Sequence, residues 1–119
     1  METFEQVYHE LRAILKPYEA GLVVEYDTAR GYSLNTHYNE KWKKVLFFGS
    51  AVIKKNYVSF YLMPVYMYPD LLEGISPGLK ARMQGKSCFN FKRPDPALFA
   101  ELTALTQKSV ERARQDALL

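Results

Sequence analysis

The sequence contains little of what most enzymes and metal sites require. Its 119 residues include a single cysteine and two histidines. One cysteine excludes an intramolecular disulfide and a zinc site built from several cysteines, and it is typical of a reducing cytoplasm. The sequence also lacks the GxSxG, GxGxxG, HExxH and Walker patterns, which place catalytic or phosphate-binding groups at a fixed spacing. We therefore expect no cofactor, and we favour a binding function over catalysis.

Long apolar runs are missing as well. No stretch approaches the roughly 20 apolar residues that a membrane-spanning helix needs. The first residues do not join a basic segment to an apolar one, as a secretory signal does. We therefore expect a cytoplasmic protein without a membrane partner. With 48% apolar and 24% charged residues, the composition is that of a soluble globular chain, and its length fits a single domain spanning residues 1–119.

Charge is distributed unevenly along the chain. The net charge of +3 divides into −4 over residues 1–27, +8 over residues 28–94 and −1 over residues 95–119. A basic middle segment can attract a phosphate, a carboxylate or a nucleic acid, although lysines at strand ends and turns also serve solubility. The cations that could converge on an anion are Lys54, Lys55, Arg82, Lys86, Lys92 and Arg93. Because no nucleic-acid-binding motif accompanies this charge, we do not expect a nucleic-acid partner.

Periodicity and capping residues predict the order of the elements. Thr3 and Gln6 form a capping-box pattern, so a helix is expected from about residue 4 until Pro17 ends it. Strands are expected at 22–26, 32–37, 45–53, 57–65 and 88–91. Short helices are expected at 68–74 and 76–85, and Asp95 with Pro96 opens a last helix. This order indicates an α+β fold, a mainly antiparallel sheet of about five strands with the N- and C-terminal helices packed on one face.

The two central strands of this sheet are unusually apolar. Alternate residues of a strand point to opposite faces, so Tyr57, Ser59 and Tyr61 lie on the face away from the helices. The preceding strand is apolar on both sides, whereas a sheet with one bare face should alternate apolar and polar residues. We therefore expect this second face to be covered. Three covers are open: the segment 67–83 folding back, a second copy of the chain, or a ligand in a pocket lined by Phe48, Tyr57, Tyr61 and Tyr66.

Two groups of residues suggest chemistry without specifying it. His37, Glu40 and Asp27 could approach a divalent ion, but two histidines are ordinary in a chain of this size. Cys88 could act as a nucleophile beside Lys86, yet neither histidine can be placed next to it as a base. We therefore assign no catalytic residue and no metal ligand.

From about Val45 to Arg114, roughly the C-terminal 60% of the chain, the sequence resembles the YdhG-like domain-of-unknown-function family. The residues that carry the resemblance are the segment Tyr57–Pro64, a short helix at 68–74, the segment Gly85–Lys92 and the closing helix Pro96–Arg114. Residues 26–33 depart from the family, which has a Ser-Tyr-Gly-Met-Pro segment there. The resemblance implies a curved antiparallel sheet with helices on one side, and some members of the family are described as frataxin-like iron chaperones.

These observations favour a small domain that binds a polar or anionic ligand, or a protein partner, on the second face of the sheet. A homodimer is one form of the second case. Within the family pattern, Lys86, Ser87 and Asn90 match a strand position most closely. The candidate ligand-binding residues are Phe48, Tyr57, Tyr61, Tyr66, Lys86, Ser87 and Asn90. The alternative is an iron-binding or iron-delivery protein that uses the carboxylates of the first helix, Glu2, Glu5 and Glu10.

Overall fold

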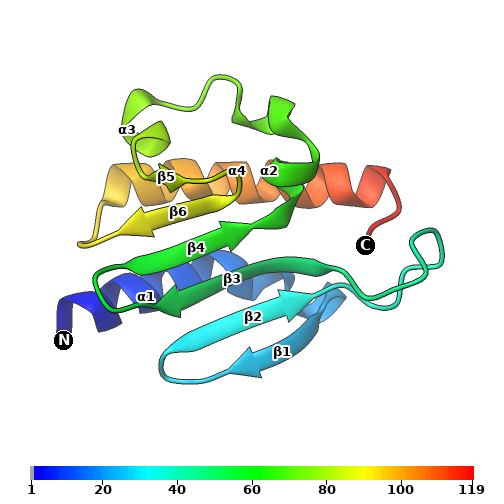
Figure 1. Ribbon diagram of the computed structural model, residues 1–119, viewed down its shortest axis with the longest axis horizontal. Helices are drawn as coiled ribbons and strands as arrows, with labels where there is room; N and C mark the ends of the chain where they lie inside the picture. The colour runs from blue at the N-terminus through cyan, green and yellow to red at the C-terminus, as the bar shows by residue number, and fades with distance from the viewer. Residues whose placement is uncertain (1) are drawn as a thin grey trace.

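Six strands form one antiparallel sheet in the computed structural model, which describes residues 2–119 (Figure 1). The order across the sheet is β1-β2-β3-β4-β6-β5, and every neighbouring pair is antiparallel. The strands are β1 (Val23–Asp27), β2 (Gly31–Asn35), β3 (Phe47–Ile53), β4 (Val58–Leu62), β5 (Met83–Gln84) and β6 (Cys88–Phe91). The expected α+β architecture is confirmed, with six strands rather than about five.

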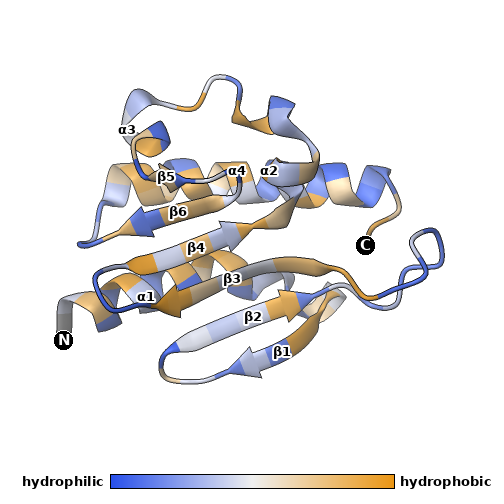
Figure 2. Ribbon diagram, in the orientation of Figure 1, coloured by the Kyte–Doolittle hydropathy of each residue, from blue (hydrophilic) through white to orange (hydrophobic). Residues whose placement is uncertain are grey.

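Two long helices cover one face of this sheet. They are α1 (Glu2–Leu15) and α4 (Pro96–Gln115), and both lie behind the sheet in Figure 1. Apolar and polar residues are interspersed along each of them in Figure 2, as expected for helices with one buried side. α1 packs on β3 and β4, and the Phe99 ring of α4 meets the Phe91 ring of β6 edge-on at 4.9 Å. The structure is therefore two layers, helices on sheet.

The core lies between these two layers. Inward-facing strand residues there are fully buried, and each such aliphatic or aromatic side chain contributes about 1.5–3 kcal/mol to stability. On the sheet side they are Tyr32, Leu34, Ala51, Val58, Phe60, Leu62, Phe89 and Phe91. On the helix side they include Val7, Leu11, Leu15, Phe99, Leu102 and Leu105.

The short elements between β4 and β6 run along one edge of the sheet, next to α4. They are α2 (Met63–Met67), the 3-10 turn η2 (Pro69–Leu72) and α3 (Pro77–Lys80). Two contacts fix this segment to α4: Arg112 pairs with Asp70, and the Ser76 hydroxyl donates to Glu101 at 2.6 Å. The segment 67–83 therefore does not cover the second face, which excludes the first of the three expected covers.

Local sequence signals predicted the start of α4 and the end of α1. The Asp95 carboxylate accepts a hydrogen bond from the Leu98 amide at 3.1 Å, so the expected cap of α4 is confirmed. α1 ends at Leu15, and the chain continues through Pro17 as a 3-10 turn, η1 (Lys16–Gly21). None of the helices in residues 2–119 is both long enough and apolar enough to span a membrane.

The expected helix at 76–85 is wrong in its second half. α3 ends at Lys80, and Met83 and Gln84 pair with Phe89 and Cys88 as the short edge strand β5. Gly85 has a φ of 77° and belongs to the tight turn between β5 and β6 rather than to a helix cap. A two-residue strand has no periodicity of its own, so only its neighbour β6 reveals it.

Candidate functional site

The second face of the sheet carries no helix. In Figure 1 no helix crosses the near side of β1 to β4. The register of the strands places one set of mostly small or polar side chains there: Ser33, Ser50, Val52, Ser59, Tyr61, Cys88 and Asn90. Within residues 2–119, nothing in the fold covers this face. Of the three expected covers, the segment 67–83 is therefore excluded, and a second copy of the chain and a ligand are the two that remain.

A bulge explains why the sequence suggested an apolar second face. Leu34 pairs with Gly49 while Asn35 pairs with Phe47, so Phe48 is an extra residue in β3. A bulge of this kind redirects the side chain of the added residue. Phe48 is 2% exposed and belongs to the core cluster, near Ala113 and Leu118. The expected position of Phe48 on the second face is therefore wrong, whereas Val52, paired with Ser59, is an apolar residue of β3 on that face.

A connected hydrogen-bond network occupies one side of the second face, across β4, β6 and β5. The Asn90 amide is at its centre, because its Oδ1 accepts from the Ser59 hydroxyl at 2.7 Å and from the Cys88 thiol at 3.3 Å. Its Nδ2 donates to the Gln84 Oε1 at 2.6 Å. The Tyr57 hydroxyl reaches the same Gln84 oxygen at 3.5 Å. These polar groups are thus held in fixed positions by rigid strands.

Tyrosine rings flank this network. The Lys54 ammonium lies 5.7 Å from the centre of the Tyr61 ring, within the range of a cation–π contact. On the same face, but toward the β1 edge of the sheet, the Tyr26 ring lies against the backbone of Gly31. A Cβ at Gly31 would approach the Tyr26 Cε1 to 2.9 Å, so a side chain at this position would displace the ring. The Ser33 hydroxyl next to it donates to Glu25 at 3.0 Å.

Three serines at the centre of the face are buried although no layer covers them. Ser33, Ser50 and Ser59 are only 2%, 4% and 1% exposed. Their short side chains lie between longer neighbours on the same face, such as Tyr61 and Glu25. We call these three serines the floor of the second face. Tyr26 and Tyr61 are larger side chains on either side of it.

The structure brings together only part of the expected site. Tyr57, Tyr61 and Asn90 lie on the second face as expected. Tyr66, which is 54% exposed, and Lys86 form a separate pair at the end of β4, with the ammonium 5.8 Å from the ring centre. Ser87 uses its backbone carbonyl to accept from the Leu62 amide at 3.0 Å.

Sequence reasoning missed several residues of this face. The sequence pattern predicts a helix at Gln84, and it does not single out Ser33 and Ser50. Both serines lie in segments with strand periodicity. Alternation within β2 and β3 could have placed the two serines on one face. Gln84 could not have been found in this way, because its position depends on the pairing of β5 with β6.

The single cysteine is poorly suited to nucleophilic catalysis. Burial raises the pKa of the Cys88 thiol, which keeps it in the protonated, less reactive form. Its hydrogen-bond partner is Asn90, not a base. In the part of the chain that the structure describes, no three His, Cys, Asp or Glu side chains gather in a way that could hold a metal ion.

Among the seven candidate residues, only Phe48 lines any of five cavities formed elsewhere by residues 2–119. The comparisons with known proteins add no identity to this geometry. No family model, no curated protein and no solved structure matches the chain.

Proposed function

We propose that the chain is a small binding domain without catalytic activity, which docks a protein partner on the second face of its sheet. One observation supports this most directly. The face is uncovered, yet it presents a hydrogen-bonded group of side chains, Tyr57, Gln84, Asn90 and Ser59, in fixed positions. Side chains that are already held in place lose little conformational entropy when a partner binds.

The positions of Tyr57, Tyr61 and Asn90 outside the five cavities favour a macromolecule over an enclosed small ligand. Small molecules bind in concave sites that bury most of their surface, and Tyr57, Tyr61 and Asn90 line none of the five cavities. Serines on the floor allow another protein to approach closely. Tyrosine is among the residues that contribute most to protein interfaces, and Tyr26 and Tyr61 stand on either side of that floor.

The partner would be recognised by polar as well as aromatic contacts. Asn90 and Gln84 offer amide groups, while Glu25 and Lys54 provide charges of opposite sign at separate parts of the face. Such an arrangement selects for orientation more than for affinity. In a second copy of this chain related by a two-fold rotation, Glu25 of one copy could face Lys54 of the other. A second copy is therefore the first partner to test.

The test places a large side chain at the centre of the floor. Ser50→Arg should abolish binding of the partner, whereas Gln107→Arg, on an exposed position of α4, should have no effect. Light scattering of the purified protein tests the second copy, and affinity enrichment from the source cells tests other proteins. Partners retained equally by wild type and Ser50→Arg, or a dimer that survives Ser50→Arg, would contradict the proposal.

The alternative of iron delivery has weaker geometric support. Glu5 and Glu10 are five residues apart on α1 and therefore about 140° apart around the helix. The side chain of Glu2 lies outside the described part of the structure. Titration with ferrous iron decides the matter: iron bound by the wild type and lost in a Glu5→Gln/Glu10→Gln variant would favour iron delivery over docking.

The YdhG-like resemblance and a cytoplasmic location remain part of this proposal. From β4 onward, the elements are strand, short helices, the two short strands β5 and β6, and a closing helix. A docking role is compatible with either a family member or an unrelated domain of the same architecture.

A further inference from the structure

The six arginines of this protein fall into two groups: Arg12 and Arg112 form ion pairs within the described residues, and the other four, which are Arg30, Arg82, Arg93 and Arg114, do not. Arg12 pairs with Asp27 at 2.6 Å and lies 4.5 Å from the centre of the Tyr32 ring. Arg112 pairs with Asp70 at 2.5 Å and lies 5.0 Å from the centre of the Tyr68 ring. Each of these two guanidinium groups is therefore engaged by one carboxylate and one aromatic ring.

Arg82 and Arg93 belong to the second group. The ion pairs formed within residues 2–119 join Arg12, Lys16 and Arg112 to carboxylates, and they include neither of these arginines nor Lys92. All three residues line a single cavity of about 420 Å³. The cavity thus gathers three exposed cations that form no ion pair within residues 2–119, and such a cluster attracts an anion.

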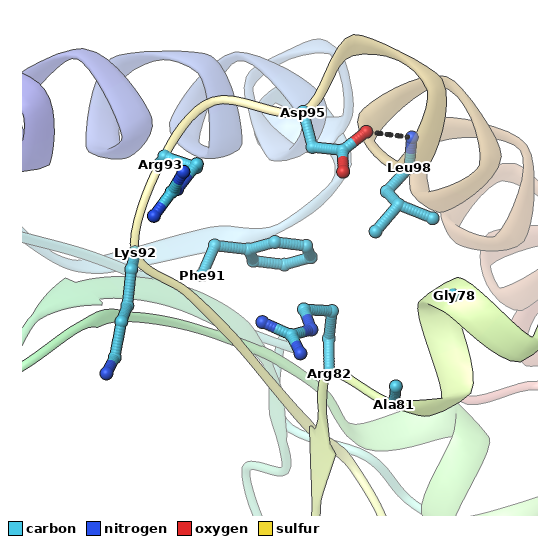
Figure 3. Close-up of a pocket in the computed structure, with 8 residues that line it drawn as sticks. All are labelled: Gly78, Ala81, Arg82, Phe91, Lys92, Arg93, Asp95 and Leu98. Carbon is cyan, nitrogen blue, oxygen red and sulfur yellow. Dashed lines mark hydrogen bonds between the residues drawn. The ribbon is translucent and has the colours of Figure 1, made fainter.

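The cavity forms where three elements meet. Arg82 follows α3. Its backbone carbonyl accepts a hydrogen bond from the backbone N–H of Asn90 in β6 at 2.8 Å, which fixes the position of the Arg82 backbone. Phe91 ends β6, and Arg93 lies on the loop that leads to α4. Figure 3 shows the guanidinium of Arg82 beneath the Phe91 ring, and Lys92 extending away from the other side chains. The two arginines are therefore the groups placed to touch a ligand, and Lys92 adds charge.

One carboxylate also lines the cavity, but it is already engaged. The Asp95 Oδ1 accepts from the Leu98 amide at 3.1 Å, so this charge is directed to the start of α4 (Figure 3). With three cations and one anion, the lining keeps a net charge of +2. Leu98 and the Phe91 edge provide apolar walls.

We propose that this cavity binds a phosphate monoester. A monoester carries a charge of about −1.5 to −2 at neutral pH, which matches the lining. The planar fork of arginine donates two parallel hydrogen bonds to phosphate oxygens. The volume lies within the range of small-molecule sites, and the apolar walls accommodate the organic part of the ester. This site is separate from the second sheet face and does not depend on the docking function.

Phenyl phosphate is the probe, and isothermal calorimetry at about 20 mM salt is the measurement, because low ionic strength preserves the attraction between charges. The wild type should bind it. An Arg82→Gln/Arg93→Gln variant should bind about tenfold more weakly or worse, since two charge-assisted contacts are lost. Arg114→Gln is the matched control: it removes one arginine charge near the far end of α4 and should change the affinity by less than about twofold.

Two further arms define the ligand class. Benzoate should bind about tenfold more weakly than phenyl phosphate, because its single charge matches the +2 lining less well. Ser50→Arg, which breaks the docking face, should leave phosphate binding intact. The proposal is overturned if the wild type does not bind phenyl phosphate, if the double variant binds as tightly as the wild type, or if Arg114→Gln weakens binding equally. Equal binding of benzoate would overturn the assignment of a phosphate. Melting temperatures of the variants confirm that each is folded.

Discussion

The two faces of one sheet differ in almost every respect, although they are built from the same strands. Under α1 and α4 the strands present Leu34, Phe60, Phe89 and other large apolar side chains, all buried by the helices. On the other face the same strands present serines, an asparagine and tyrosines, with no helix above them (Figure 1). Alternation along each strand is sufficient to separate a face that holds the fold together from a face free to bind.

Burial also has a different origin on each side. Ala51 is buried because a helix layer lies over it, whereas Ser50, next to it in β3, is buried only by its neighbours on the face. A low exposed fraction therefore does not by itself mean that a residue belongs to a core. A larger side chain should be tolerated at Ser50 but not at Ala51, and this difference distinguishes a residue of the open face from a residue of the core.

The largest expected effect comes from adding an arginine on either side of β3. Ala51→Arg would force an unpaired charge into the core and should cost more than about 4 kcal/mol, enough to unfold many domains. Ser50→Arg can extend into solvent and should cost about 1 kcal/mol. Urea denaturation of the two variants measures the difference. Equal losses would mean that the second face is covered.

Removing side chains from β4 should give a smaller contrast in the same direction. Phe60→Ala leaves a cavity between sheet and helices and should cost about 3–5 kcal/mol. Ser59→Ala removes one hydrogen bond to Asn90 and should cost about 1 kcal/mol. Chemical denaturation again provides the values. A loss for Ser59→Ala as large as that for Phe60→Ala would contradict the division between the faces.

Acid should weaken the ion pair between Arg12 and Asp27 on the helix side of the sheet. The Arg12 guanidinium of α1 donates to Asp27 and lowers the pKa of that carboxyl below its ordinary value. The pair therefore stabilises the fold above the ordinary aspartate pKa of about 3.9, and this contribution is lost as the pH falls through the lower folded value. Because both side chains are partly exposed, the effect should be at most about 1 kcal/mol.

Asp27→Asn measures this contribution. The difference in unfolding free energy between wild type and variant should be present at pH 7 and should shrink as the pH falls below the ordinary aspartate pKa of about 3.9. Arg12→Gln should behave in the same way, and the double variant should lose little more than either single one. A difference that stays constant between pH 7 and pH 3 would show that the ion pair is not its source.

The smallest expected effect concerns the thiol of the second face. Burial raises the pKa of Cys88, so its reaction with a maleimide at pH 7 should be slower than that of a free cysteine with a pKa of about 8.5. The reaction should nevertheless go to completion in the native protein, because no helix covers the face. A rate that matches global unfolding would instead show that Cys88 is inaccessible.

Local signals predicted most of the fold. The cap at Asp95, the terminal helices and the central strands β3 and β4 depend on residues close together in the sequence, and all are present. The strand β5 was missed because Met83 and Gln84 become a strand only by pairing with β6. The position of Phe48 was wrong because a bulge, which no single-strand pattern reveals, reverses its face.

The candidate site was predictable only in part for the same reason. Tyr57 and Tyr61 follow from alternation within one strand. The network around Asn90 requires the register that pairs Ser59 with Asn90, and the anionic-ligand cavity requires α3, β6 and α4 to meet. Contacts of this kind between distant segments are set by the packing of the whole domain.

Tyrosines on both faces allow the most direct test of the central proposal, that the second face is open in the isolated chain. Hydroxyl-radical footprinting of the monomer should oxidise Tyr61 readily and leave Tyr32, which is fully buried on the helix side, protected. Protection of Tyr61 to the same degree as Tyr32 at a concentration where the protein is monomeric would contradict the account.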